Sequence, residues 1–257
     1  MVRPGFIRFR CSAGLLVKLV AIYSCCALGA ISALVLLSEE TSVHDKAIIK
    51  MALGLNLLWC VLCGMLMRRF GEPLGARVRA IPLPWRLKFI LFATALALAE
   101  EAITVSMTNL APLFGSEVGK AFITASANYL HTVLFHSVIV FIPMFVAWSF
   151  LLGRYDFSAA SVFLLFGLTG SLAEMSMQPM NILGGFWFFV YGLMVYVPVR
   201  ALPPASERGA RPPQRRHYAL AVVLPLVSPV LLLPFAPLLS YLYRVMAPEF
   251  FVETPFG

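Results

Sequence analysis

The chain has 257 residues, of which 60% are hydrophobic and only 12% are charged. Soluble domains are about a quarter charged, so this composition excludes an ordinary water-soluble globular protein. The net charge of +8 does not indicate nucleic-acid binding, because the Lys and Arg residues cluster in the gaps between apolar blocks. We therefore expect an all-α, polytopic integral membrane protein whose surroundings are the lipid bilayer and which binds no nucleic acid.

Seven apolar stretches are long enough to cross roughly 30 Å of hydrocarbon at about 20 residues each. The first follows three arginines but is longer than the core of a signal peptide, so we expect it to remain as a helix. The predicted spans are 14–37, 47–67, 87–107, 129–152, 158–178, 182–199 and 217–243. The sequence thus predicts a single transmembrane domain over residues 1–257, a bundle of about seven helices.

The distribution of Lys and Arg predicts the direction of the spans. Sixteen of the twenty fall in the N-terminal segment or in every second connection after it. Cytoplasmic loops are enriched in Lys and Arg, so we expect the N-terminus in the cytoplasm and the C-terminus outside, in the inner or plasma membrane. The connection 201–216 is rich in Pro and Arg and is expected to be a solvated cytoplasmic linker. The last span contains four prolines, so we expect it to be kinked.

Five ionisable side chains lie inside the predicted spans, where each costs a few kcal/mol or more and indicates a functional site. These residues are Glu100, Glu101, His131, His136 and Glu174. With a rise of about 1.5 Å per residue, four of them lie roughly 6–13 Å below the outer surface, and His131 lies near the rim. We therefore expect a polar layer in the outer half of the membrane.

Helical spacing predicts which of these side chains face one another. Shared faces are expected for Thr94, Glu101, Thr104 and Thr108, for Tyr129, Thr132 and His136, and for Gly167, Gly170, Ser171 and Glu174. Glu100 points about 100° away from Glu101, and His131 is separated from His136 by about 140° around the helix. We expect Glu101, His136 and Glu174 to form the inner set, with Glu100 and His131 behind it or at the rim.

Carboxylate and imidazole groups in a packed site are ligands for a divalent metal, with zinc expected before iron, manganese or copper. The function predicted first is a metal-dependent intramembrane hydrolase that acts on a lipid or a membrane peptide. In this hypothesis Glu101 is the catalytic base or a ligand, and Glu100 supports it. The metal ligands are His136 and Glu174, with His131 in support.

Two alternatives use the same residues without a metal. Glu and His side chains form proton relays or cation sites in proton- or cation-coupled transporters. They also hold helices together, as expected for a non-catalytic subunit or assembly factor of a larger membrane complex. Substitution of Glu101 by Gln separates the three, because it stops turnover in an enzyme, uncouples a carrier and weakens assembly of a scaffold.

The Glu100–Glu101 doublet followed by membrane histidines resembles the CAAX-protease and bacteriocin-processing family of intramembrane peptidases. That resemblance implies a doublet that activates water and histidines on later helices that complete the site. The likeness covers the doublet and the order of a following His, whereas the Arg that the family has four residues beyond the doublet is absent. The doublet with Thr108 and Asn109 is also faintly similar to small membrane lycopene cyclases, without their preceding proline. We assign the chain to neither family.

Overall fold

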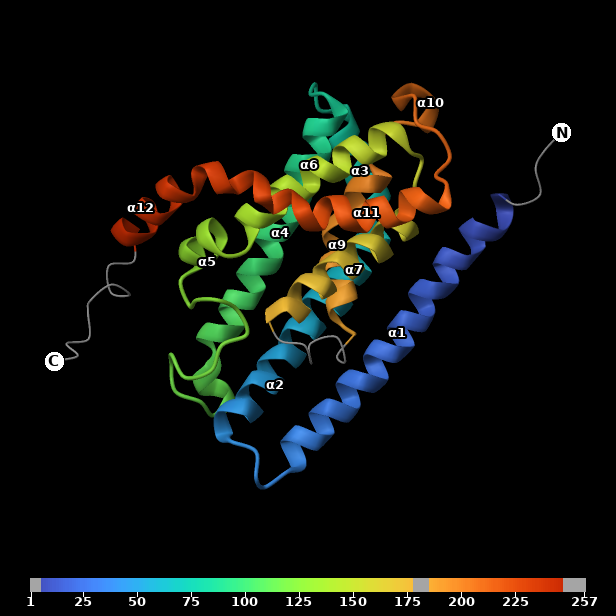
Figure 1. The fold of residues 1–257 in the computed structure, drawn as a ribbon. Helices are drawn as coiled ribbons and strands as arrows, with labels where there is room; N and C mark the ends of the chain where they lie inside the picture. Colours follow the sequence, from blue (N-terminus) through green and yellow to red (C-terminus); the bar gives the residue numbers. More distant parts are fainter. Residues whose placement is uncertain (1–5, 178–184, 247–257) are drawn as a thin grey trace.

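The computed structural model describes residues 6–177 and 185–246, which fold almost entirely as helices (Figure 1). Helix makes up 81% of the structure, and the described residues form no strand, only one isolated bridge between Tyr155 and Arg211. The all-α prediction is confirmed. The elements are α1 (Phe6–Leu37), α2 (Val43–Leu55), the π-helix η1 (Asn56–Cys63), α3 (Gly64–Ala80), α4 (Trp85–Asn109), the 3₁₀ turn η2 (Ala111–Phe114), α5 (Tyr129–Phe135), α6 (Val138–Arg154), α7 (Ala159–Met177), α9 (Trp187–Arg200), α10 (Ala205–Arg208), α11 (Arg215–Val227), the 3₁₀ segment η3 (Ser228–Phe235) and α12 (Ala236–Met246).

Several helices are long and apolar enough to cross a membrane. Four qualify among the described residues, namely Ala13–Leu37, Val43–Ala80, Trp85–Asn109 and Arg215–Met246, and the bent pair α5–α6 makes a fifth. The predicted spans 158–178 and 182–199 correspond to the shorter apolar helices α7 and α9. These helices confirm the character of a helical membrane protein, while seven crossings and their direction remain predictions. Residues 178–184, between the fifth and sixth predicted spans, and the predicted outer C-terminus lie outside the described residues.

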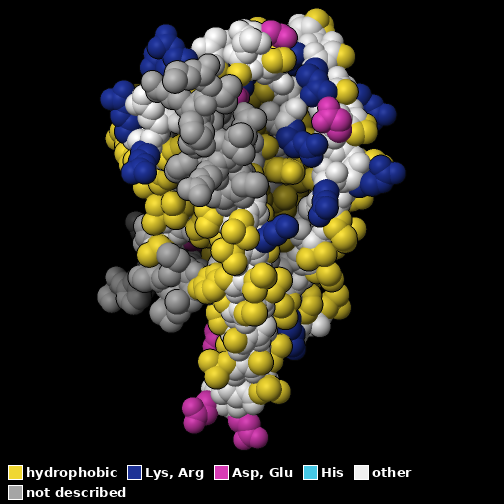
Figure 2. All heavy atoms as spheres, turned by 90° about the vertical axis from the view of Figure 1, so that its right-hand side faces the viewer, with side chains coloured by type: hydrophobic (Ala, Val, Ile, Leu, Met, Phe, Trp, Pro, Cys, Tyr) yellow, Lys and Arg dark blue, Asp and Glu magenta, His cyan; other side chains and the backbone are white. Residues whose placement is uncertain are grey.

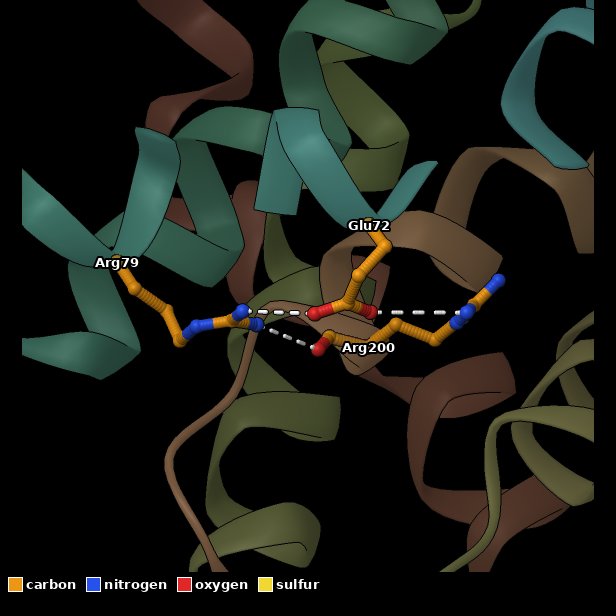
Figure 3. A network of polar contacts seen from close by, with 3 residues as sticks. All are labelled: Glu72, Arg79 and Arg200. Atoms are coloured by element: carbon orange, nitrogen blue, oxygen red, sulfur yellow. Dashed lines mark hydrogen bonds and ion pairs between the residues drawn. The ribbon is translucent and has the colours of Figure 1, made fainter. Parts of the chain in front are cut away.

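One end of the bundle, which we call the basic end, collects the C-terminal part of α3, the end of α9 and the helix α10. Figure 2 shows most of the Lys and Arg side chains of that face in its upper part, and acidic side chains at the lower tip. At the basic end Glu72 lies between Arg79 and Arg200 (Figure 3), with N–O distances of 2.8 and 3.6 Å. The Glu72–Arg200 pair joins α3 to α9, whereas the Glu72–Arg79 pair lies within α3. Such partly exposed pairs contribute roughly 0–1 kcal/mol each.

The linker 201–216 is more ordered than the solvated segment expected from its composition. It contains the short helix α10, and the side chain of Arg208 at its end is only 4% exposed. The Arg208 guanidinium donates to the carbonyls of Leu152 and Pro203 and to Asp156, the last at 3.1 Å. An arginine with several fixed acceptors can be buried at acceptable cost, so the linker is held against the turn after α6.

The fourth predicted span is bent. α5 ends at Phe135, α6 begins at Val138, and their axes differ by 42°. Ser137 between them has φ −121° and ψ −77°, outside the helical region. The bend therefore separates the segment that carries His131 and His136 from the rest of the span, and the single helix expected over 129–152 is replaced by two.

The last helix runs antiparallel to α5 and α6. Near the basic end, Tyr155 stacks on His217 of α11 with ring centroids 3.9 Å apart. At the other end, Tyr243 of α12 lies 4.7 Å from the ring of His131. The two contacts are 26 residues apart along the last helix and 24 along α5–α6, so the two segments stay side by side throughout.

The last segment, for which the sequence predicts a kink, changes its helix type at its prolines. Residues Ser228–Phe235 form the 3₁₀ segment between α11 and α12. Pro229 has no N–H, so the carbonyl of Pro225 loses its helical partner. The hydroxyl of Ser228 donates to that carbonyl at 2.7 Å, which satisfies the group inside the bundle.

α7 and α9 approach closely because glycines lie at their contact. A Cβ at Gly167 would lie 2.5 Å from the backbone carbonyl oxygen of Phe188, and one at Gly192 would lie 2.6 Å from the ring of Phe163. Small residues at a helix interface allow backbones to come this near in a membrane. The pair therefore forms a tight unit in the centre of the bundle (Figure 1).

We predict that Gly167→Ala lowers the free energy of unfolding by about 1–3 kcal/mol, because the added methyl collides with backbone that cannot move aside. Gly29→Ala in α1 is the matched control, since nothing lies within 4 Å of its added Cβ. Thermal unfolding of both variants in detergent checks this expectation. Equal stability of the two variants would contradict the close α7–α9 contact.

Candidate functional site

Both residues of the acidic doublet are buried in the bundle. Glu100 is 5% and Glu101 4% exposed, and both lie in the C-terminal half of α4. The two carboxyl groups have different buried neighbours, and the expected order, with Glu101 in the inner set and Glu100 behind it or at the rim, stays a prediction. The hydroxyl of Thr104 donates to the Glu100 carboxyl at 2.8 Å, and the hydroxyl of Thr124 donates to Glu101 at 2.8 Å.

A third carboxyl group joins them from α7. Glu174 is half-buried and accepts a short hydrogen bond from the hydroxyl of Tyr191 on α9. The charges of Glu100, Glu101 and Glu174 lie close enough to interact with one another. We call these three residues the carboxyl cluster. The structure thus brings together three of the five predicted site residues.

The partners that the structure gives to the doublet are hydroxyl groups. None of the ion pairs among the described residues involves Glu100 or Glu101. Ser137, at the bend between α5 and α6, also lies beside Glu101. A hydroxyl can donate to an ionised carboxyl or accept from a protonated one, so these partners suit a group that changes its protonation state.

The connection after α4, which we call the outer connection after its predicted side, lies beside Glu101. Its segment 123–127 lies along the polar face of α4 that the sequence predicts. The Thr124 hydroxyl donates to Glu101, the backbone N–H of Ile123 donates to the Thr108 hydroxyl at 3.3 Å, and the Asn109 side chain donates to the carbonyl of Ala127 at 2.8 Å. These hydrogen bonds hold the connection against the C-terminal half of α4 beside Glu101.

The two histidines lie on α5 and at its end. Their rings are 4.9 Å apart, and Tyr243 of α12 lies 4.7 Å from His131 and 6.1 Å from His136. His131 is buried and His136 is exposed. Because α5 ends at Phe135, the 140° separation expected from a continuous helix does not apply, and the two rings lie together. They form the contact between α5 and the last helix.

All five predicted site residues belong to the described part of the chain. Over that part, no group of three or more His, Cys, Asp or Glu side chains is arranged to hold a metal ion. The predicted ligand set of His131, His136 and Glu174 therefore finds no support in this arrangement. The divalent metal, zinc, iron, manganese or copper, stays a prediction.

A π-helix lies beside the cluster. In η1, Cys60 is close enough to Glu100 for an electrostatic interaction. The indole N–H of Trp59 donates to the carbonyl of Val190 at 3.0 Å, which ties η1 to the part of α9 that carries Tyr191. π-helical segments occur frequently at functional sites. Sequence reasoning found no signal for η1, nor for Thr124 and Tyr191, which lie in a loop and in an apolar run.

No protein-family model, curated protein or solved structure matches this chain. The chemistry of the site is therefore argued from its own residues. Buried carboxyl groups with hydroxyl partners hold and release protons, or bind a cation that offsets their charge.

We predict that Thr104→Val destabilises the protein by about 1–3 kcal/mol, because the buried Glu100 carboxyl loses its hydroxyl donor while the side-chain volume is kept. Ser106→Ala is the control, since its exposed hydroxyl donates only to the carbonyl of Ala102 in the same helix. Unfolding of both variants is followed by circular dichroism in detergent.

The double variant Glu100→Gln/Thr104→Val sharpens this test, because a neutral amide loses less when the donor is removed. The cost of Thr104→Val should fall in the Glu100→Gln background. An unchanged cost in both backgrounds would contradict the assigned hydrogen bond.

Proposed function

We propose that this chain is a seven-span carrier whose carboxyl cluster takes up and releases protons at the outer side of the membrane. The observation that carries the proposal is that two buried carboxyl groups and a half-buried third interact in an apolar bundle, with hydroxyls as partners. Like charges held this close in a low-dielectric site are not all ionised at once. Such a cluster binds a proton and releases it when its surroundings change, which is the step that coupled transport requires.

The arrangement of the helices supports the seven-span topology. The last helix lies beside the bent pair α5–α6 at both ends, which fits two neighbouring crossings in opposite directions. α7 and α9 are short but form one tightly packed unit. The basic end gathers the connections in which most Lys and Arg residues lie, which supports an inner position for that end.

The surroundings of the cluster favour access from the outer side. Toward the basic end, the helices of the bundle carry large apolar side chains that are fully buried, such as Phe145 of α6, Phe166 of α7 and Met194 of α9. The rings of Phe145 and Phe166 lie 5.5 Å apart and fill this layer. Toward the other side, the segment 123–127 places the Thr124 hydroxyl on Glu101 and the backbone N–H of Ile123 on Thr108. A site closed by apolar packing on one side fits a carrier that opens to one side at a time better than a continuous channel.

The position of the doublet also favours a second candidate, the hydrolase that acts on a lipid or membrane peptide. Glu101 lies directly under the outer segment, where a carboxylate could act as base toward water. Incubation of wild type and Glu101→Gln protein with lipid extracts and membrane peptides separates the candidates. A product formed by the wild type and lost in the variant supports hydrolysis. If neither protein forms a product, the carrier is the function that stands.

We predict that dicyclohexylcarbodiimide, an apolar reagent for protonated carboxyl groups, modifies the carboxyl cluster at neutral pH. Mass spectrometry should find the adduct on Glu100, Glu101 or Glu174 and should not find it on Glu117, which is exposed in the outer connection. The adduct should disappear when the three are replaced by Gln. Folded wild-type protein without any adduct in the cluster would contradict the proposal.

We predict that a reporter fused after Gly257 lies outside the cell, while the same reporter inserted in the linker 201–216 lies in the cytoplasm. Activity of paired cytoplasmic and extracytoplasmic reporters measures both positions. A cytoplasmic signal at Gly257 would exclude the seventh crossing.

A further inference from the structure

The hydroxyl of Tyr191 lies among all three groups of the carboxyl cluster. It donates to Glu174 and is close enough to Glu100 and Glu101 to interact with their charges. Tyr191 is 7% exposed and belongs to α9, whereas the carboxyl groups come from α4 and α7. One hydroxyl on α9 therefore bonds to a carboxyl group of α7 and lies within electrostatic range of the doublet on α4.

The ring of Tyr191 fits in its place because residue 170 is glycine. Gly170 is one turn before Glu174 on α7, and a Cβ there would lie 2.1 Å from the ring. On its other sides the ring meets Phe141, at a centroid distance of 5.6 Å, and Trp187, at 5.8 Å. Even alanine at position 170 would therefore push the ring against packed aromatic neighbours.

We propose that Tyr191 is the positioning residue of the carboxyl cluster and that Gly170 allows its hydroxyl to reach Glu174. The hydroxyl holds the Glu174 carboxyl toward Glu100 and Glu101, so that a proton leaving one carboxyl group meets another. This inference deepens the proposed function. Its consequence for proton exchange rests on that proposed function, whereas the hydrogen bond between Tyr191 and Glu174 does not.

The chemistry of the side chain gives the reason. A phenol has one O–H to donate, and a bond from it to a carboxylate in apolar surroundings is stronger than one in water. Phenylalanine fills the same volume without the donor. Tyr191→Phe therefore separates the position of the carboxyl group from the packing of the ring, and Gly170→Ala displaces the ring while keeping its hydroxyl.

The infrared C–O stretching band of Tyr191 tests the contact. In each protein tested, the band is isolated by subtracting the infrared spectrum of the same protein with the added substitution Tyr191→Phe. We expect the band to shift in Glu174→Gln and in Gly170→Ala protein, and to stay in place in Glu117→Gln protein, which loses an exposed carboxyl group of the outer connection. A band that stays in place in Glu174→Gln protein would overturn the proposal, whether or not Gly170→Ala folds.

The rate of carbodiimide modification at Glu174 tests the consequence. We expect a several-fold change in Tyr191→Phe and in Gly170→Ala protein, with no further change in the double variant. Tyr196→Phe, further along the same helix, should keep the wild-type rate. Modified wild type with an unchanged rate in Tyr191→Phe overturns the positioning role and leaves the proposed function. If the wild type is not modified but the Tyr191 band shifts in Glu174→Gln protein, the contact stands and the proposed function is overturned.

Discussion

The burial of ionisable carboxyl groups is the constraint on which the rest of this structure depends. Glu100 and Glu101 are nearly inaccessible in an apolar bundle, and a buried carboxyl group is tolerated only with hydrogen-bond partners. Those partners come from different elements: Thr104 from α4 itself and Thr124 from the outer connection. The glycine-rich contact of α7 and α9 adds Glu174 with its own hydroxyl partner. Helix packing and the position of the connection after α4 therefore both supply hydrogen-bond partners to these carboxyl groups.

The features that depend on local sequence could be predicted. Each of the seven apolar stretches has a helical counterpart, because hydrophobicity over some 20 residues decides where a helix can lie in lipid. Helical spacing placed Thr104 and Thr108 on the face of Glu101, whereas the Thr104 hydroxyl bonds to Glu100 and the Thr108 hydroxyl accepts from Ile123. The interruption of the last helix follows from the missing N–H of its prolines.

The features that depend on tertiary contacts could not be predicted from the sequence. Nothing local to the sequence marks the end of α5 at Phe135, and this end places the histidines beside Tyr243 instead of in an inner set with Glu101. Thr124 lies in a loop, where no periodicity indicates direction. In the sequence, Tyr191 is one aromatic residue in an apolar run. Its position beside Glu174 depends on Gly170 of another helix, which leaves room for its ring. These misses share a cause, since each depends on which segments pack together.

Infrared spectroscopy of the protein in lipid nanodiscs tests the central claim most directly. The absorption of protonated carboxyl groups is compared at neutral pH between the wild type and the triple variant Glu100→Gln/Glu101→Gln/Glu174→Gln. The account predicts a protonated carboxyl band in the wild type that the variant lacks, because a buried cluster of interacting carboxyl groups retains at least one proton. Identical spectra from two folded proteins would contradict a proton-holding cluster and leave these residues as helix contacts.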